Sequence, residues 1–160
     1  MENVVVADFT NPIHAEAIVY LLNEYAKDEM GGGSELSKFV KENLIAELQT
    51  RSYTLAILAY VHNEPAGLAI CIEGFSSFSC MPLLNVHDMV VAPKFRGRGI
   101  SLKILAKVEE VARERKCCKL TLEVLDGNTI AQNAYRSFGF KGYELDPKKG
   151  KAMFWQKKID

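Results

Sequence analysis

Residues 94–101 read KFRGRGIS and combine two glycines with three cationic side chains. They lie between an apolar run at residues 83–91 and a stretch with helical periodicity. The first N–H groups of a helix lack partners within the helix and, together with the helix dipole, favour an anion. The glycines leave the backbone open to a ligand, and the cations add attraction. The turn therefore predicts a phosphate or pyrophosphate site; the alternative is a plain strand-to-helix turn whose glycines serve geometry alone.

Two familiar nucleotide-binding motifs are excluded. The Walker pattern G-x-x-x-x-G-K-[ST] does not occur in the sequence. The dinucleotide pattern needs a third glycine, but Gly97 and Gly99 are followed by Leu102 at that position. In a dinucleotide-binding fold the pattern also lies at the first strand-to-helix turn, whereas several predicted strands precede the turn at residues 94–101.

The four cysteines, Cys71, Cys80, Cys117 and Cys118, form no C-x-x-C pair. A zinc site is therefore not expected, and the sequence predicts no metal. Buried thiols in a reducing compartment are the expectation for such residues.

Composition restricts the class of protein. The 160 residues include 20 Lys plus Arg and 20 Asp plus Glu, so the formal charge is zero and no basic stripe points to nucleic acid. The N-terminus lacks a signal-peptide layout, and no apolar run approaches the ~20 residues that cross a membrane. We predict a cytoplasmic protein with one domain, residues 1–160, and neither nucleic-acid nor membrane partners.

Periodicity predicts the order β-α-α-β-β-β-α-β-α-β-β, an α/β domain. The expected strands cover residues 3–8, 53–61, 66–73, 83–91, 119–125, 140–144 and 152–159. The first expected helix begins at Asn11-Pro12. Three further helices are expected at residues 34–49, 99–115 and 128–138. In the second helix the pattern turns Leu36, Phe39, Val40 and Leu44 inward, and residues 74–82 are expected to form a loop.

Two motifs in register resemble the GNAT superfamily of acetyl-CoA-dependent N-acetyltransferases. The family turn Q/R-x-x-G-x-G/A corresponds to residues 96–101, RGRGIS. The second signature, N-x-x-A-x-x-x-Y followed by G-F, corresponds to Asn128, Ala131 and Tyr135, then residues 139–140. Ser101 departs from the family pattern, which has Gly or Ala there; serine is small, and its N–H still suits a phosphate.

The resemblance implies a mixed, mostly antiparallel sheet of six or seven strands with four helices, splayed between strands 4 and 5 to admit coenzyme A. An edge with unpaired backbone groups is the physical basis of that kind of binding. Three sets of residues would hold acetyl-CoA: Met89, Val90 and Val91 at the pantetheine arm, Arg96, Gly97, Arg98, Gly99, Ile100 and Ser101 at the pyrophosphate, and Asn128, Ala131 and Tyr135 along the cofactor.

The implied activity is acetyl transfer to a primary amine by direct attack in a ternary complex. No cysteine is then needed as a nucleophile, although Cys80 stays an open alternative. The leaving thiolate needs a proton, and a phenol keeps its proton at neutral pH. Tyr135 matches the family's tyrosine and is predicted as the general acid; the alternative is a tyrosine packed on the sheet.

The base is predicted at His87, where many relatives have glutamate. Histidine changes charge near neutral pH and accepts a proton directly or through water, although a structural histidine is the alternative. If strand alternation holds, Asn85, His87 and Met89 share a face and Asp88 lies opposite, an assignment that a β-bulge would upset.

The acceptor site is predicted at Tyr25, Asp28 and Glu29, whose carboxylates would attract a cationic amine; the alternative is an exposed helix end. Residues 74–82 would form another wall. The strand and this loop loosely resemble the diamine acetyltransferase branch. A small amine is the first choice of acceptor, and a protein N-terminus or lysine the second. The competing class is an acyl-CoA sensor of the same fold, and a homodimer through the sheet edge is a further expectation.

Overall fold

The computed structural model describes residues 1–159 and divides into two compact units, Met1–Leu122 and the residues from Glu123 onward. The first unit contains one five-stranded sheet in the order β1-β2-β3-β4-β5. Its strands are β1 Glu2–Val6, β2 Thr54–Val61, β3 Glu64–Ser76, β4 Met81–Val91 and β5 Leu120–Leu122. Neighbours β1 to β4 pair antiparallel, and β4 pairs with β5 in parallel.

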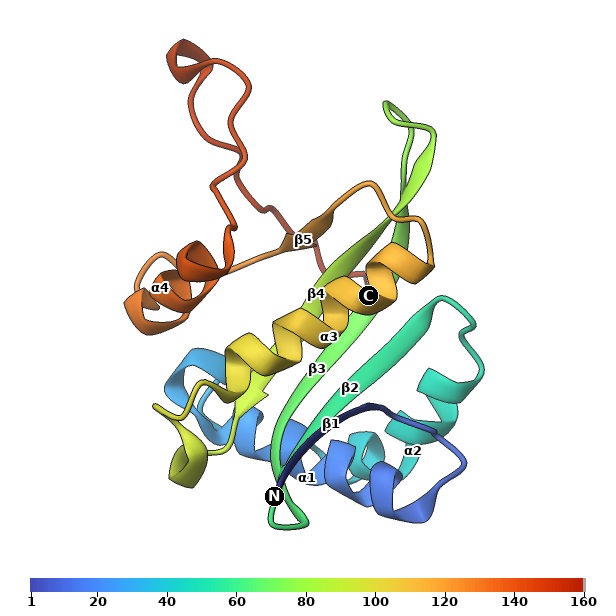
Figure 1. Ribbon diagram of the computed structural model, residues 1–160. Helices are drawn as coiled ribbons and strands as arrows, with labels where there is room; N and C mark the ends of the chain where they lie inside the picture. The colour runs from blue at the N-terminus through green and yellow to red at the C-terminus, as the bar shows by residue number, and fades with distance from the viewer. Residues whose placement is uncertain (160) are drawn as a thin grey trace. The chain divides into compact units, whose positions relative to one another are not determined.

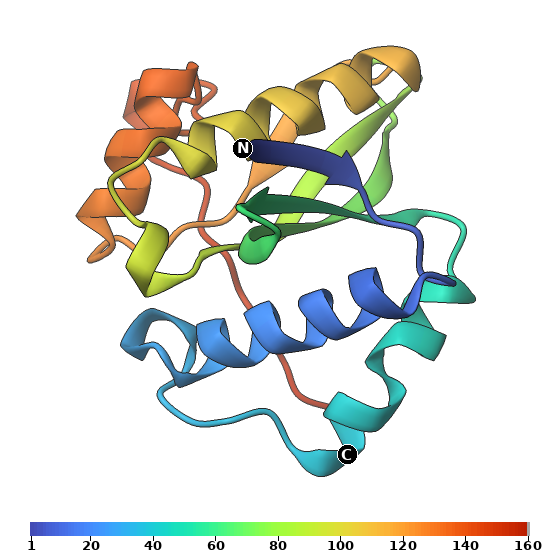
Figure 2. The same ribbon diagram turned by 60° about the horizontal axis from the view of Figure 1, so that its bottom comes forward.

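Three helices cover this sheet. Helices α1 (Pro12–Lys27) and α2 (Lys38–Gln49) lie on one face, and α3 (Ile100–Glu114) lies on the other (Figure 2). Strand β2 is buried along nearly its whole length because both layers cover it. The largest fully buried side chains come from both helical layers and the central strands: Ile18, Leu21, Ile57, Leu58, Leu68, Leu84, Ile104, Leu105 and Val108.

Side-chain caps fix where the first two helices begin. The Asn11 carboxamide oxygen accepts a hydrogen bond from the Ile13 N–H at 2.9 Å, and Pro12 suits the first turn. Ser37 caps α2 through the Val40 N–H, so this helix begins later than residue 34. From that start Val40, Leu44 and Leu48 follow at four-residue spacing. Phe39 is 72% exposed, and the prediction that it points inward is wrong.

The hairpin of β3 and β4 is longer than the pattern predicted. Strand β3 runs to Ser76 and β4 begins at Met81, so most of the predicted loop at residues 74–82 is paired strand (Figure 1). Gly74 opposite Leu83 and Phe75 opposite Pro82 continue the ladder. The serine and phenylalanine content of this stretch concealed its extended backbone.

The second unit contains α4, Thr129–Phe138, which begins at an Asn128 cap and ends at Gly139 with φ 111°. Among residues 139–159 no strand forms, so the strands predicted at 140–144 and 152–159 are wrong. The described sheet has five strands, not six or seven. Both segments are short and mostly exposed; Trp155, for example, is 80% exposed. The Ala152 N–H donates a long hydrogen bond of 3.4 Å to the Tyr143 carbonyl. An isolated pair of short strands is only marginally stable.

The α/β class, the four helices and the mixed, mostly antiparallel sheet are confirmed. Within residues 1–159, no helix has the length and apolar character needed to cross a lipid bilayer.

Candidate functional site

The turn between β4 and α3 has the open backbone that its sequence predicts. Gly97 and Gly99 have φ values of 76° and 73°, a region that favours glycine. A Cβ atom built at either glycine meets no heavy atom within 4 Å, so both face open space. Gly99 is the N-cap of α3 and offers no side-chain cap to the first turn. The N–H groups at this helix start are therefore available to an anion.

The cations around this turn mostly serve to hold it. Arg96 donates through Nε to the Val91 carbonyl at 3.1 Å and through a terminal nitrogen to the Asp28 carboxylate at 2.8 Å. Arg98 and Lys94 lie over the buried Phe95 ring, at 5.6 Å and 4.9 Å from its centroid. Arg96 thus joins the turn to the C-terminal end of α1, and its guanidinium is engaged within the protein.

This ion pair bears on the predicted acceptor residues. The Asp28 carboxylate accepts from Arg96 and from the Met30 N–H, and both bonds, that of Arg96 first, hold the pKa of Asp28 below its usual range. Glu29 lies exposed in the short 3-10 turn that follows. The charge expected to attract an amine at Asp28 is therefore largely compensated by Arg96.

Strand β4 contains a β-bulge at His87. The ladder with β3 pairs Ile70 with Asp88 and Cys71 with Val86, which leaves His87 as the extra residue. The His87 side chain is exposed. The condition of unbroken alternation is therefore not met, and the bulge, the stated alternative, exchanges the faces of the residues that follow it.

The pairing of β3 with β4 shows which face of the sheet Asp88 lies on. A Cβ atom on Gly67 would meet Ile104 and Ile100 of α3, so Gly67 points toward α3. Ile70, three residues along β3, points to the opposite face, and its partner Asp88 shares that face. Asp88 thus lies on the side of the sheet that α1 covers.

Asp88 and Tyr25 interact on that side. Burial raises the pKa of the Asp88 carboxyl, and the neighbouring His87 lowers it by less. Burial also raises the pKa of Tyr25, and the charges of Asp88 and Asp28 raise it further. Asp88 is a candidate proton acceptor that the sequence reasoning missed, although the polar His-Asp pair inside an apolar strand was the available signal.

The downstream half of β4 lies beyond the reach of β5. The parallel pairing begins with Leu84 opposite Leu120 and stops at Val86 opposite Leu122. In the described ladders, Asp88 to Val91 pair with β3 alone, so one edge of this half is open to an extended ligand. The predicted residues Met89, Val90 and Val91 lie here, and the Val91 carbonyl already accepts from Arg96.

The second motif has a local explanation within its own unit. The Asn128 side chain accepts from the Ala131 N–H at 3.2 Å and so caps α4. Tyr135 is half-buried, and its ring meets Phe140 edge-on with centroids 5.9 Å apart. Asn128 thus caps α4, and Tyr135 packs against the residue that follows its end. The predicted contact of Asn128, Ala131 and Tyr135 with a cofactor stays a prediction.

Burial disfavours the thiolate of two cysteines, Cys71 and Cys117, because it raises the pKa of each thiol. Burial raises the pKa of Cys71 to about 12, and Cys80 lies exposed at the hairpin tip. Among the described residues, no group of three or more His, Cys, Asp or Glu side chains is arranged to hold a metal ion.

Comparison with known proteins gives a consistent result. The sequence model described as the acetyltransferase (GNAT) family matches residues 18–140. A Bos taurus thialysine N-epsilon-acetyltransferase is 39% identical over 82 residues, which cover 48% of this chain and 47% of that protein. The chain therefore spans about half the length of this relative. The Caenorhabditis elegans thialysine N-epsilon-acetyltransferase is 27% identical over 124 residues, 78% of this chain and 75% of its own.

Solved structures share the fold. The crystal structure of a probable acetyltransferase superposes with a TM-score of 0.81 at 21% identity and covers 99% of both chains. AAC(6')-Iy, solved with the bisubstrate analogue CoA-S-monomethyl-acetylneamine, superposes with a TM-score of 0.75 at 19% identity and covers 99% of both chains.

Proposed function

The chain belongs to the acetyltransferase (GNAT) family, and from this premise we propose that it transfers an acetyl group from acetyl-CoA to a primary amine of a small molecule. The observation that carries the proposal is the uncapped start of α3, where Gly97 and Gly99 leave the backbone open. Such a helix start fits a pyrophosphate. The open edge of β4 beside it fits an extended ligand arm.

The residues divide the work between binding and proton transfer. Bound acetyl-CoA supplies an activated thioester. The amides of residues 97–101 would hold the pyrophosphate, and the free edge at Met89 and Val90 would orient the adjoining arm. The amine would attack the thioester carbonyl directly in a ternary complex, without an acyl-cysteine; the exposed Cys80 stays the alternative nucleophile.

The incoming amine must lose a proton before or during attack. His87 at the bulge and Asp88 next to it are the two candidates to accept this proton. Asp88 has the pKa raised by burial, which makes its carboxylate a stronger base, and it lies on the side of Tyr25. His87 is the exposed alternative acceptor and lies in contact with solvent. Tyr135 is proposed as the proton donor to the leaving thiolate, on the basis of the motif that it shares with the family.

The relatives suggest which amines to test. Curated relatives are named for thialysine and aminoglycoside acetylation, so thialysine, lysine, diamines and aminoglycosides form the first panel. The assay measures release of free thiol from acetyl-CoA. Amine-dependent turnover above hydrolysis is expected with at least one compound of the panel. Saturable acetyl-CoA binding without turnover on any amine would favour the acyl-CoA sensor, which is the competing function.

The proton donor is tested by Tyr135→Phe. Loss of the phenol should lower kcat by about 100-fold, within the usual contribution of general acid catalysis, and leave acetyl-CoA affinity nearly unchanged. Tyr143→Phe removes a phenol from the same unit outside the motif and serves as the matched control. Equal kcat values for Tyr135→Phe and wild type would remove this role from Tyr135.

The two proton acceptors are separated by pH–rate profiles. His87→Ala should leave the acidic limb of kcat/KM in place if Asp88 is the base, whereas Asp88→Asn should abolish that limb. The reverse pattern would assign the base to His87. A homodimer through the sheet edge and a cytoplasmic location are retained as proposals.

A further inference from the structure

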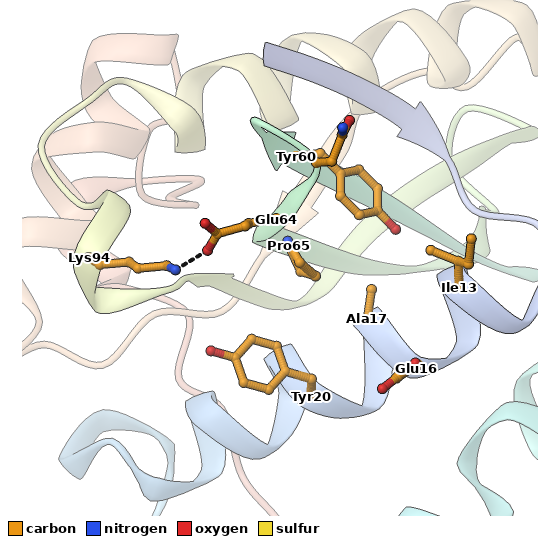
Figure 3. Close-up of a pocket in the computed structure, with 9 residues that line it drawn as sticks. Ile13, Glu16, Ala17, Tyr20, Tyr60, Glu64, Pro65 and Lys94 are labelled. Carbon is orange, nitrogen blue, oxygen red and sulfur yellow. Dashed lines mark hydrogen bonds and ion pairs between the residues drawn. The ribbon is translucent and has the colours of Figure 1, made fainter. Parts of the chain in front are cut away.

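A hollow of about 400 Å³ lies between the N-terminal half of α1 and the turn that joins β2 to β3. Ile13, Ala17 and Pro65 supply its apolar lining. Tyr20 from α1 and Tyr60 from β2 supply two aromatic rings (Figure 3). Its volume lies within the range of small-molecule sites, and its lining combines apolar surface with a few polar groups.

The Tyr60 hydroxyl is a buried polar group without a satisfied hydrogen bond. Within residues 1–159 no partner is found for this oxygen, although it is shielded from solvent. Figure 3 shows the hydroxyl end of Tyr60 turned toward α1, on the side of Ile13 and Ala17. Burial raises the pKa of Tyr60, so the phenol stays protonated. Buried hydroxyls are normally paired, so this unpaired oxygen costs stability; because it is shielded from solvent, a ligand in the hollow would meet the Tyr60 ring and not this oxygen.

The charges around the hollow do not balance. Glu64 pairs with Lys94 at one side (Figure 3). Glu16 also lines the hollow, and in the described part of the chain no cation forms an ion pair with it. One carboxylate therefore remains uncompensated beside two phenol rings. Carboxylates and tyrosine faces both attract compact organic cations.

We propose that this hollow binds a small alkylammonium ion, with its charge at Glu16, its hydrocarbon part on Ile13 and Pro65, and an aromatic wall from Tyr20 and Tyr60. The site is distinct from the proposed acceptor region. Ala17 and Tyr25 are separated by eight residues of α1, about 12 Å along the helix axis. The inference goes beyond the proposed function, because it needs neither acetyl-CoA nor turnover.

The test is a titration of the full chain, without acetyl-CoA, followed by backbone amide NMR. The probe is n-propylammonium, and its uncharged counterpart is n-propanol. We expect saturable shifts at Glu16, Ala17, Tyr60 and Asn63 with the amine, with a dissociation constant on the order of a few millimolar for so small a ligand. Propanol should produce no saturable shift at these residues.

Two variants examine the recognition. Glu16→Gln should raise the dissociation constant of n-propylammonium by about tenfold, the effect of losing one charge-assisted hydrogen bond. Glu114→Gln neutralises an exposed carboxylate on the last turn of α3 and should leave binding unchanged. Tyr60→Leu should weaken probe binding, because it removes one of the two aromatic rings of the wall.

Each contrary outcome identifies what failed. Equal shifts with propylammonium and propanol would show an apolar crevice and overturn the proposal. Shifts confined to Tyr25 and Asp88 would place the amine in the acceptor region alone, which would overturn this site and support the proposed function. No saturable shift anywhere would overturn the site and leave the acetyl-transfer assay to decide the activity separately.

Discussion

The two halves of β4 have different surroundings. The upstream half, from Leu84 to Val86, lies between β3 and β5. The downstream half, from Asp88 to Val91, follows the bulge at His87, pairs with β3 alone in the described ladders, and leads into the turn before α3.

This contrast separates stability from function within one strand. Leu84 is fully buried, and the Asn85 side chain donates to the Thr121 hydroxyl at 3.1 Å, so the upstream half holds β5 to the sheet. The downstream half does not pair with β5, so its edge is open. It also carries the half-buried carboxyl of Asp88. One inserted residue thus divides a single strand into a structural part and a candidate binding part.

The largest effect is expected in the upstream half. Leu84→Ala should lower the free energy of unfolding by about 3 kcal/mol, because it leaves a cavity in the core. Urea unfolding measures this change. Acetyl-CoA affinity of the folded protein should stay within a factor of about two. Met89→Ala, at a half-buried position downstream, is the matched control and should cost less than half as much. Equal costs would contradict the division of the strand.

The second-largest effect is expected on acetyl-CoA binding, at the turn that follows the downstream half of β4. Gly99→Glu should weaken acetyl-CoA binding by about 100-fold, because it places a side chain and a negative charge at the start of α3. Isothermal titration calorimetry measures the affinity, and circular dichroism checks the fold. Gly142→Glu adds the same charge at an open position of the second unit and should bind like wild type. Unchanged binding in a folded Gly99→Glu protein would remove the pyrophosphate from this turn.

The smallest effect concerns Asp88 and depends on pH. Burial raises the pKa of Asp88 in the folded state, so the folded protein holds this proton more tightly than the unfolded chain. Stability from this group is therefore fully present below the ordinary aspartate pKa of ~4 and is lost as pH rises through the raised value. Asp88→Asn should raise the melting temperature at pH 7 by about 3 °C, the change that roughly 1 kcal/mol produces.

The same variant supplies its own control at low pH. At about pH 3 both forms carry an uncharged side chain at position 88, and the difference in melting temperature should disappear. A difference of the same size at both pH values would attribute the effect to packing instead of charge. Thermal melts followed by circular dichroism distinguish the two.

Sequence patterns predicted the elements whose signals are local. The Asn11-Pro12 start of α1, the glycine turn before α3 and the Asn128 start of α4 each depend on residues within one turn of a helix. The family motifs then gave the sheet type and the helix count correctly, although the first unit alone supplied all five described strands.

The failures arise where long-range pairing decides the outcome. Alternation alone could not settle the face of Asp88, because a bulge is specified by the partner strand and no residue type in β4 announces it. The strands expected at residues 140–144 and 152–159 had suitable residues but formed no ladder in the described structure. Phe39 has an apolar side chain at helical spacing, yet it lies on the exposed side of α2, whereas Leu48 is buried.

The order of the sheet also has a consequence for biosynthesis. Strands β1 to β4 are each beside their predecessor, and β2 joins β3 through a two-residue turn at His62 and Asn63, both with positive φ. Every strand of the sheet has left the ribosome once Leu122 is free of the exit tunnel. We therefore expect the nascent chain to complete its sheet by successive local pairings, with the parallel addition of β5 as the last and slowest step before the remaining residues emerge.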